Sequence, residues 1–458
     1  MVLVALASFT GAGMYPSAVR GADDGSHLIV TVTKPVLSAA LTQEIDRADP
    51  VRECLLGARI TGIGRTKATV TVELVPCERA AIFDLVLKGT TASDTVAASG
   101  PARVSTSNKA AFTAQKRIVL DVRSLQVSPT TVRATEDSVL TGIGTDRPRL
   151  IGPLVRRIAA RSYERDKAKA AKAGTDLTEL RLREQFDAGV ADALPGSGVG
   201  PASPLTDLFQ TLGLDLATVA LRTTTDAIVA SARVGSEPCR VTPPPAPTGA
   251  GVVIRVHESF VAATTSASLG KKLVSPDRLY TELESLFGPP SPSDETPEVV
   301  EILARFAASP ATVEFSDGTI KLTIRMESFR IAGMDYPGMD VMVRYKIVGT
   351  RLVRDGDSVV QPPGYSPKDR LTASQLAVRA LLRRLVLPDL FPAKASFPPI
   401  ALPSGNDELE VTHLSATSGW LVVGVQVVPT VKQVAEVRAN GRGVIDQLRG
   451  KQLLRSVR

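Results

Sequence analysis

The chain has 458 residues, which is too long for one ordinary hydrophobic core, so we expect two or three domains. Apolar residues make up 43% of the chain and aromatic residues 4%, so the cores must be aliphatic, and single-stranded nucleic acids and carbohydrates, which stack on aromatic rings, are disfavoured partners. The net charge is +7, and no run of 18 apolar residues could cross a membrane as a helix.

Residues 1–26 form the first segment. The apolar run "VLVALASFTGAG" precedes small and polar residues up to "VRGADD", an order typical of the hydrophobic and cleavage regions of a secretory signal. The basic residues that open such a signal are missing. We therefore expect a signal peptide or a disordered N-terminus, and a secreted or periplasmic protein. The alternative is a buried N-terminal strand.

A first α+β module is expected at 27–237. It opens with "LIVTVTKPVLSAAL", a short apolar strand followed by a helix that starts at a proline. Residues 58–76 then alternate apolar and polar side chains around a Gly62-Ile63-Gly64 turn, and two similar stretches follow. This pattern predicts long antiparallel strands with one apolar face each.

Three cysteines occur in the chain, Cys54, Cys77 and Cys239, and no C-x-x-C pair that would indicate a zinc ribbon or a redox site. In an exported protein, Cys54 and Cys77 are the candidate disulfide, which would stabilise the fold by roughly 3 kcal/mol. The alternative is three separate buried thiols.

A basic helical insert interrupts the strands. Residues 148–172 carry Ile151, Leu154 and Ile158 at helical spacing, and a second helical stretch follows Gly174. Between residues 147 and 185, eleven Arg and Lys are opposed by five Asp and Glu. We expect these side chains to contact an anionic surface: Arg156, Arg157, Arg161, Arg165, Lys167 and Lys169. The alternative is a solvated helix face.

The stretch "CRVTPPPAPTGAG" predicts a linker at 238–251, followed by a second α+β module at 252–430 and a C-terminal helical tail at 431–458. This module begins with "VVIRVHESFV" and then predicts helices at 275–288 and 296–308. Hairpins with turns at Asp317-Gly318 and Asp355-Gly356 follow, then a long amphipathic helix at 366–391 and a final strand pair.

The two modules match each other at both ends. A constant offset of 224 places Leu28 on Val252 and Val32 on Val256. An offset of 193 places Leu221 on Leu414 and Val229 on Val422, in the closing hairpins. Two matches at corresponding ends favour an internal duplication. The fold class predicted is therefore α+β, with two pseudo-repeated modules that are each a curved antiparallel sheet packed on a long amphipathic helix.

This order of elements resembles the tubular lipid-binding superfamily of the BPI type, in which a twisted sheet wraps a long helix, often in two copies. The resemblance is carried by the two opening units, by long helices at about 148–172 and 368–391, and by the closing hairpins. The chain also looks like uncharacterised exported bacterial proteins. The basic helix in the first module departs from the simple tubular pattern.

The resemblance implies a non-enzymatic protein that binds an apolar ligand, a lipid above all, between sheet and helix. We expect no cofactor and no metal, because His27, His257 and His413 are scattered without ligand spacing. An anionic membrane surface is a candidate partner, and nucleic acid is not expected. Two alternatives stay open: an envelope-associated structural protein without a cavity, and a hydrolase around His257, Glu258 and Ser259.

Overall fold

The fold was analysed in a computed structural model. It describes residues 25–121, 124–145, 151–193, 219–275, 302–366, 368–383, 391–397, 399–401 and 407–429. The predicted signal region, except for its last two residues, and the predicted tail at 431–458 lie outside these ranges. So does most of the helix predicted at 275–288. None of the helices described has a stretch that is long and apolar enough to cross a membrane.

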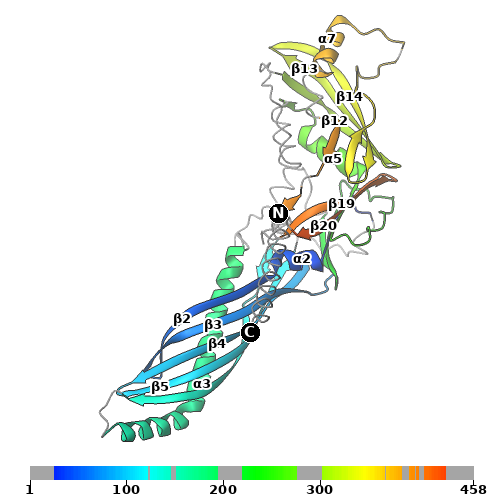
Figure 1. The fold of residues 1–458 in the computed structure, drawn as a ribbon. Coiled ribbons are helices and arrows are strands. Elements are labelled where there is room, and N and C mark those ends of the chain that lie inside the picture. Colours follow the sequence, from blue (N-terminus) through cyan, green and yellow to red (C-terminus); the bar gives the residue numbers. More distant parts are fainter. Residues whose placement is uncertain are drawn as a thin grey trace, which may run out of the picture.

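The described strands form three antiparallel sheets, and Figure 1 shows the central one between the other two. The central sheet joins strands from both ends of the chain in the order β18-β19-β20-β10-β1-β9-β8. Their bounds are β1 Leu28–Thr33, β8 Val219–Thr223, β9 Ala227–Ala232, β10 Val252–His257, β18 Ile400–Ala401, β19 Asp407–Thr417 and β20 Trp420–Pro429. The two predicted modules thus share one sheet.

Pairing in the central sheet follows the two sequence offsets. Leu221 pairs with Ala230 in the β8–β9 hairpin. The residues 193 positions later, Leu414 and Val423, pair with each other in the β19–β20 hairpin. Strand β1 pairs with β9 as β10 pairs with β20. Both opening strands run into a helix, α2 (Lys34–Leu41) after β1 and α5 (Glu258–Leu269) after β10.

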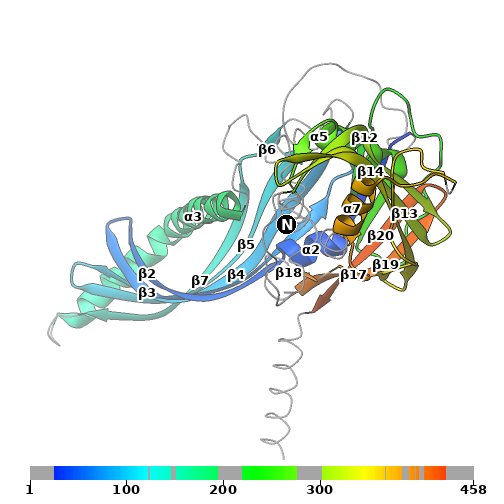
Figure 2. The ribbon, with the colours of Figure 1, turned by 90° about the horizontal axis from the view of Figure 1, so that it is seen from above.

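The first curved sheet extends from one side of the central sheet. Its strands are β2 Gln43–Leu55, β3 Ala58–Leu74, β4 Ala81–Ser99, β5 Ala102–Leu120, β6 Leu125–Val127 and β7 Thr131–Thr145. Helix α3 (Gly152–Ala193) lies along the concave side of this sheet, as Figure 2 shows from above. We call the side that faces α3 the inner face. The end with the β2–β3 and β4–β5 turns, far from the central sheet, is the distal end.

The second curved sheet pairs in the order β11-β12-β13-β14-β15-β17, with β16 on β14. Its apolar face is covered by Val378 of the short helix α7 (Ala373–Leu381) and by Leu382, which directly follows this helix. The strands are β11 Leu273–Val274, β12 Ile302–Ser316, β13 Thr319–Ile331, β14 Met334–Val348, β15 Arg351–Arg354, β16 Val359–Gln361 and β17 Lys394–Ser396.

Several sequence predictions need correction. The Gly62-x-Gly64 segment is not a turn, because both glycines lie inside β3, where the Cβ-less Gly62 lets the Asp94 carbonyl approach. The two helical stretches around Gly174 are one helix, α3. The helix predicted at 296–308 is a strand from residue 302 on, in β12. The long helix predicted at 366–391 is helical only as α7 and the turn after it within the described residues. The described residues therefore do not confirm a layout of two modules that each pack on a long amphipathic helix.

Candidate functional site

The inner face of the first curved sheet is apolar near the central sheet. Side chains from β4 and β5 that point to this side are buried against Phe186 and Val190 of α3. They are Phe83, Leu85, Leu87, Ala114 and Ile118. They belong to one buried cluster that continues into the central sheet. The strand period of two places every second residue of β4 and β5 on this face, as the alternation in the sequence predicted.

Polar contacts fix the second half of α3 to the inner face. The buried Lys116 ammonium of β5 and the Thr130 hydroxyl both donate to the Asp187 carboxylate. The Glu179 carboxylate accepts from the backbone N–H of Ala134 at 3.0 Å. Burial alone would raise the pKa of Asp187, but the hydrogen bonds from Lys116 and Thr130 outweigh it and lower this pKa.

Two further contacts lie closer to the distal end. Arg181 of α3 forms an ion pair with Glu53 of β2, which joins the helix to the edge strand of the sheet. Helix α3 comes so close to β7 at Gly174 that a Cβ there would lie 2.6 Å from the Glu136 carboxylate. Burial, and then the charge of Glu53, raise the pKa of Glu136. The inner face therefore holds its carboxylates where α3 covers them.

The distal half of the inner face carries a polar cluster, which corrects the expectation of an aliphatic lining throughout. The cluster consists of hydroxyls and one amide, most of them half-buried, and Val51, Ile60 and Val104 share the face nearer the distal end. Thr66 pairs with Thr91 and Thr95 with Thr106, each at 2.9 Å between hydroxyl oxygens. The Asn108 amide donates to Thr95 Oγ1 at 3.1 Å and accepts from Ser138 at 2.6 Å. These residues form no sequence motif, so only the strand pairing shows that they lie together.

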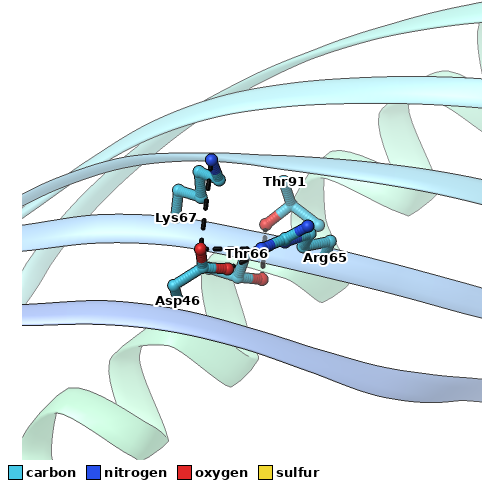
Figure 3. Close-up of polar contacts among 5 residues, drawn as sticks. All are labelled: Asp46, Arg65, Thr66, Lys67 and Thr91. Carbon is cyan, nitrogen blue, oxygen red and sulfur yellow. Dashed lines mark hydrogen bonds and ion pairs between the residues drawn. The ribbon is translucent and has the colours of Figure 1, made fainter. Parts of the chain in front are cut away.

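The outer face of the same strands carries ordinary surface ion pairs. Figure 3 shows Asp46 of β2 between Arg65 and Lys67 of β3, with Thr66 and Thr91 forming their own contact. Both oxygens of Asp46 accept from Arg65 at 2.8 Å, and Lys67 lies 3.9 Å away. Alternation along the strand places Thr66 on the face opposite Arg65 and Lys67. The hydrogen bond from Arg65 lowers the pKa of Asp46.

The start of α3 lies at the distal end of the sheet, as Figure 1 shows. All six predicted basic contacts, Arg156, Arg157, Arg161, Arg165, Lys167 and Lys169, are exposed there. The apolar side chains expected to form a buried stripe are exposed too, by 54% at Ile151, 60% at Leu154 and 59% at Ile158. The polar contacts described between α3 and the sheet, at Glu179, Arg181 and Asp187, all lie in the second half of the helix. Basic and apolar side chains therefore share one exposed surface.

The predicted disulfide is not formed. Cys54, Cys77 and Cys239 are free thiols. Cys54 pairs with Arg59 at the distal end of β3, while Cys77 bonds with Thr223 of the central sheet beyond the other end. The sixteen residues from Arg59 to Leu74 span about 50 Å of strand, whereas a disulfide requires Cα atoms within about 7 Å.

The histidine cluster lies where β1, β10 and β20 meet. The His257 ring lies 5.1 Å from Trp420 and 6.0 Å from His27, both of which are buried. His257 is the N-cap of α5: its Nδ1 accepts from the backbone N–H of Ser259 at 3.3 Å and lies 2.7 Å from the Ser259 hydroxyl. The Glu258 carboxylate accepts from the backbone N–H of Phe315 at 3.4 Å. Helix capping and strand packing account for these three residues.

No group of three His, Cys, Asp or Glu side chains suited to a metal ion occurs among the residues that the structure describes. The candidate site is therefore sought on the inner face and at the start of α3. The inner face is apolar near the central sheet and carries a polar cluster farther out, and the exposed start of α3 lies at the distal end.

Comparison with known proteins gives only distant likenesses. No protein-family profile and no curated protein match this sequence. Among solved structures, the chain is similar to a lipopolysaccharide binding protein, with a TM-score of 0.29 and 12% identity, over 88% of this chain and 99% of that one. It is also similar to P47 of Clostridium botulinum E1, with a TM-score of 0.23 and 8% identity, over 88% of this chain and 98% of that one. Scores at this level assign neither a fold nor a ligand.

Proposed function

We propose that this protein is an exported, non-enzymatic lipid-binding protein that contacts an anionic lipid surface with the start of α3 and holds an apolar ligand between α3 and the sheet. The observation that supports the proposal best is the exposed row of Ile151, Leu154 and Ile158. Large apolar side chains grouped on one exposed face mark a surface that binds another apolar body.

The charges around this row favour a lipid partner over a neutral one. Arg161 and Arg165 continue the same helix face, three and seven residues after Ile158. Residues 151–165 contain four arginines and one acidic residue, Glu164. Guanidinium groups bind phosphate through two parallel hydrogen bonds, and apolar side chains beside them can enter the acyl region. A surface of anionic phospholipids matches both properties.

The apolar part of a bound lipid would lie on the inner face near the central sheet. Val70 and Leu74 of β3 and Leu182 of α3 are only half-buried there, although they pack against the buried cluster. Aliphatic walls of this kind suit acyl chains, which need no directional contacts.

Vesicles test this function directly. The full chain is mixed with phosphatidylcholine vesicles, with or without one quarter phosphatidylglycerol, that carry a fluorescent phospholipid. We expect the protein to float with the anionic vesicles and to remove labelled lipid into a soluble complex. Protein that neither floats nor takes up the label contradicts the proposal.

One observation favours the structural alternative. The buried cluster on the inner face continues without interruption into the central sheet, as it would in a protein with a fully packed core. Such a protein would bind the vesicle surface and leave the labelled lipid in the vesicles. The hydrolase alternative has no comparable support, since His257 and Ser259 serve the cap of α5.

A further inference from the structure

The inner face changes from apolar to polar at one level of the sheet. Ala68 of β3, Gly89 of β4 and Phe112 of β5 lie side by side across three strands. A Cβ on Gly89 would lie 2.7 Å from Phe112 Cζ and 2.5 Å from Ala68 Cβ. Only glycine therefore leaves room for the Phe112 ring, which lies at the boundary of the apolar half. Beyond this level a cluster of Thr, Ser and Asn side chains lies on the inner face, and Ile60 and Val104 follow it on the same face nearer the distal end.

The polar half is a connected network. Ser138 donates to the Asn108 carbonyl oxygen, the Asn108 amide donates to Thr95 Oγ1, and Thr95 pairs with Thr106. Each hydroxyl oxygen has more hydrogen-bonding capacity than these contacts use. Ser138, Asn108 and Thr106 are only half-buried, so a small polar group can reach them.

Helix α3 carries an unsatisfied donor on the side that faces the sheet. Tyr163 lies eleven residues before Gly174, or about three helical turns, and so on the same side of α3 that touches Glu136. The Tyr163 hydroxyl oxygen is buried and has no hydrogen-bond partner among the described residues. Buried hydroxyls are normally paired, so this one points to a missing partner.

The charges at this site select against an anion. Glu136 of β7 is a carboxylate of the inner face and would repel a phosphate, while Glu53 is paired with Arg181. The arginines at the start of α3 are exposed, outside the inner face. An uncharged group with many hydroxyls fits, because it can both donate to the carboxylates and accept from Tyr163 and Asn108.

We propose that the polar half of the inner face binds the uncharged, hydroxyl-rich headgroup of a glycolipid, whose acyl chains lie on the apolar half. The inference rests on the proposed lipid-binding function and names its ligand class. Recognition uses hydroxyl and amide hydrogen bonds instead of aromatic stacking, so the scarcity of aromatic residues does not oppose it.

Two lipids with the same acyl chains test this inference: dioleoylglycerol and its monoglucosyl derivative. Binding of each to the full chain is measured by native mass spectrometry and by titration. The test variant is Thr95→Val with Thr106→Val and Asn108→Leu, which removes the network. The control is Thr90→Val with Thr113→Val, two exposed threonines of the same two strands. Thermal unfolding confirms that both variants are folded.

We expect wild type and control to bind the glucosyl lipid at least about tenfold more tightly than dioleoylglycerol, the effect of one or two hydrogen bonds. The test variant should lose this preference and keep its affinity for dioleoylglycerol. Equal affinity for both lipids in wild type, or an unchanged preference in the test variant, overturns the inference while the lipid-binding function stands. Methyl glucoside binding as tightly as the glucosyl lipid would also overturn it. Wild type that binds neither lipid refutes both proposals.

Discussion

Lys116 of β5 forms an ion pair with Asp187 of α3, and its side chain is only 8% exposed. This contact lies in the same half of α3 as Phe186 and Val190, which complete the buried cluster. The helix is thus held to the sheet through its second half, and its first turns present Ile151, Leu154 and their basic neighbours to solvent. Attachment at one end and exposure at the other are what a membrane-contacting helix requires.

Lys116→Met tests this attachment. The change leaves the Asp187 carboxylate without its buried partner, so we expect the free energy of unfolding to fall by about 2 kcal/mol. Urea denaturation measures the loss, and amide exchange should become faster in residues 179–190. Asp46→Asn, which breaks an exposed ion pair on the outer face, is the control and should leave stability unchanged. Equal effects of the two substitutions would contradict the role given to Lys116.

Replacing the exposed row tests its contact with lipid. The triple variant Ile151→Ser, Leu154→Ser and Ile158→Ser should bind anionic vesicles at least about tenfold more weakly, because three apolar side chains no longer enter the bilayer. Its melting temperature should not fall. The control replaces three equally exposed residues of the second curved sheet and α7 with serine: Met334, Val348 and Leu376. A control that loses as much vesicle affinity as the test variant would show that the row has no special role.

Neutralising the arginines tests the electrostatic part. Changing Arg156, Arg157, Arg161 and Arg165 to Gln should weaken binding to anionic vesicles severalfold per residue and flatten its salt dependence. Binding to neutral vesicles should hardly change. The control removes the same charge from β13 and β14, by changing Lys321, Arg330, Arg344 and Lys346 to Gln. If test and control variants lose affinity alike, net charge and not position would explain the binding.

The histidine cluster predicts acid sensitivity. Burial, followed by the charges of His257 and Arg233, lowers the pKa of His27, and burial lowers the pKa of His257 despite the opposing charge of Glu258. Both folded-state pKa values lie below the ordinary value near 6.5. As the pH falls below about 6.5, the unfolded chain takes up protons first, so the free energy of unfolding decreases. Above this pH both histidines are neutral in the folded and in the unfolded state, so they do not make the free energy of unfolding depend on pH.

Urea unfolding at about pH 7.5 and about pH 5.5 measures this loss of stability. The variant His27→Asn with His257→Asn keeps a side-chain acceptor at the N-cap of α5 and should lose less stability on acidification. His413→Asn, outside the cluster, is the matched control. An acid-induced loss that is the same in the double variant would assign the sensitivity to other groups.

The equivalent strands of the central sheet were predictable from the sequence, but their pairing was not. The offset of 224 equates Leu28 with Val252, whereas the antiparallel pairing places Leu28 opposite Val256. That the opening strands of the two predicted modules meet in one sheet depends on contacts that no local pattern encodes. The turn at Asp317-Gly318 was confirmed because its signal is local, and Asp317 and Gly318 both have positive φ.

The candidate site was harder to predict, because it depends on which elements meet. Ile151, Leu154 and Ile158 have the spacing of a buried stripe, and only their exposure in the structure shows them to be a surface. The network of Thr95, Thr106 and Asn108 is built from residues that form no sequence motif, and only the strand pairing brings them together. Cys54 and Cys77 are close in sequence but far apart, since a single long strand separates them.

The most direct measurement is to purify the full chain from a host like its own, extract it with organic solvent and analyse the extract by mass spectrometry. We predict a stoichiometric lipid that survives purification, and that Lys116→Met, which loosens α3, carries less of it. A wild-type protein that contains no lipid and takes up none from added phospholipid or glycolipid would contradict lipid binding between α3 and the sheet.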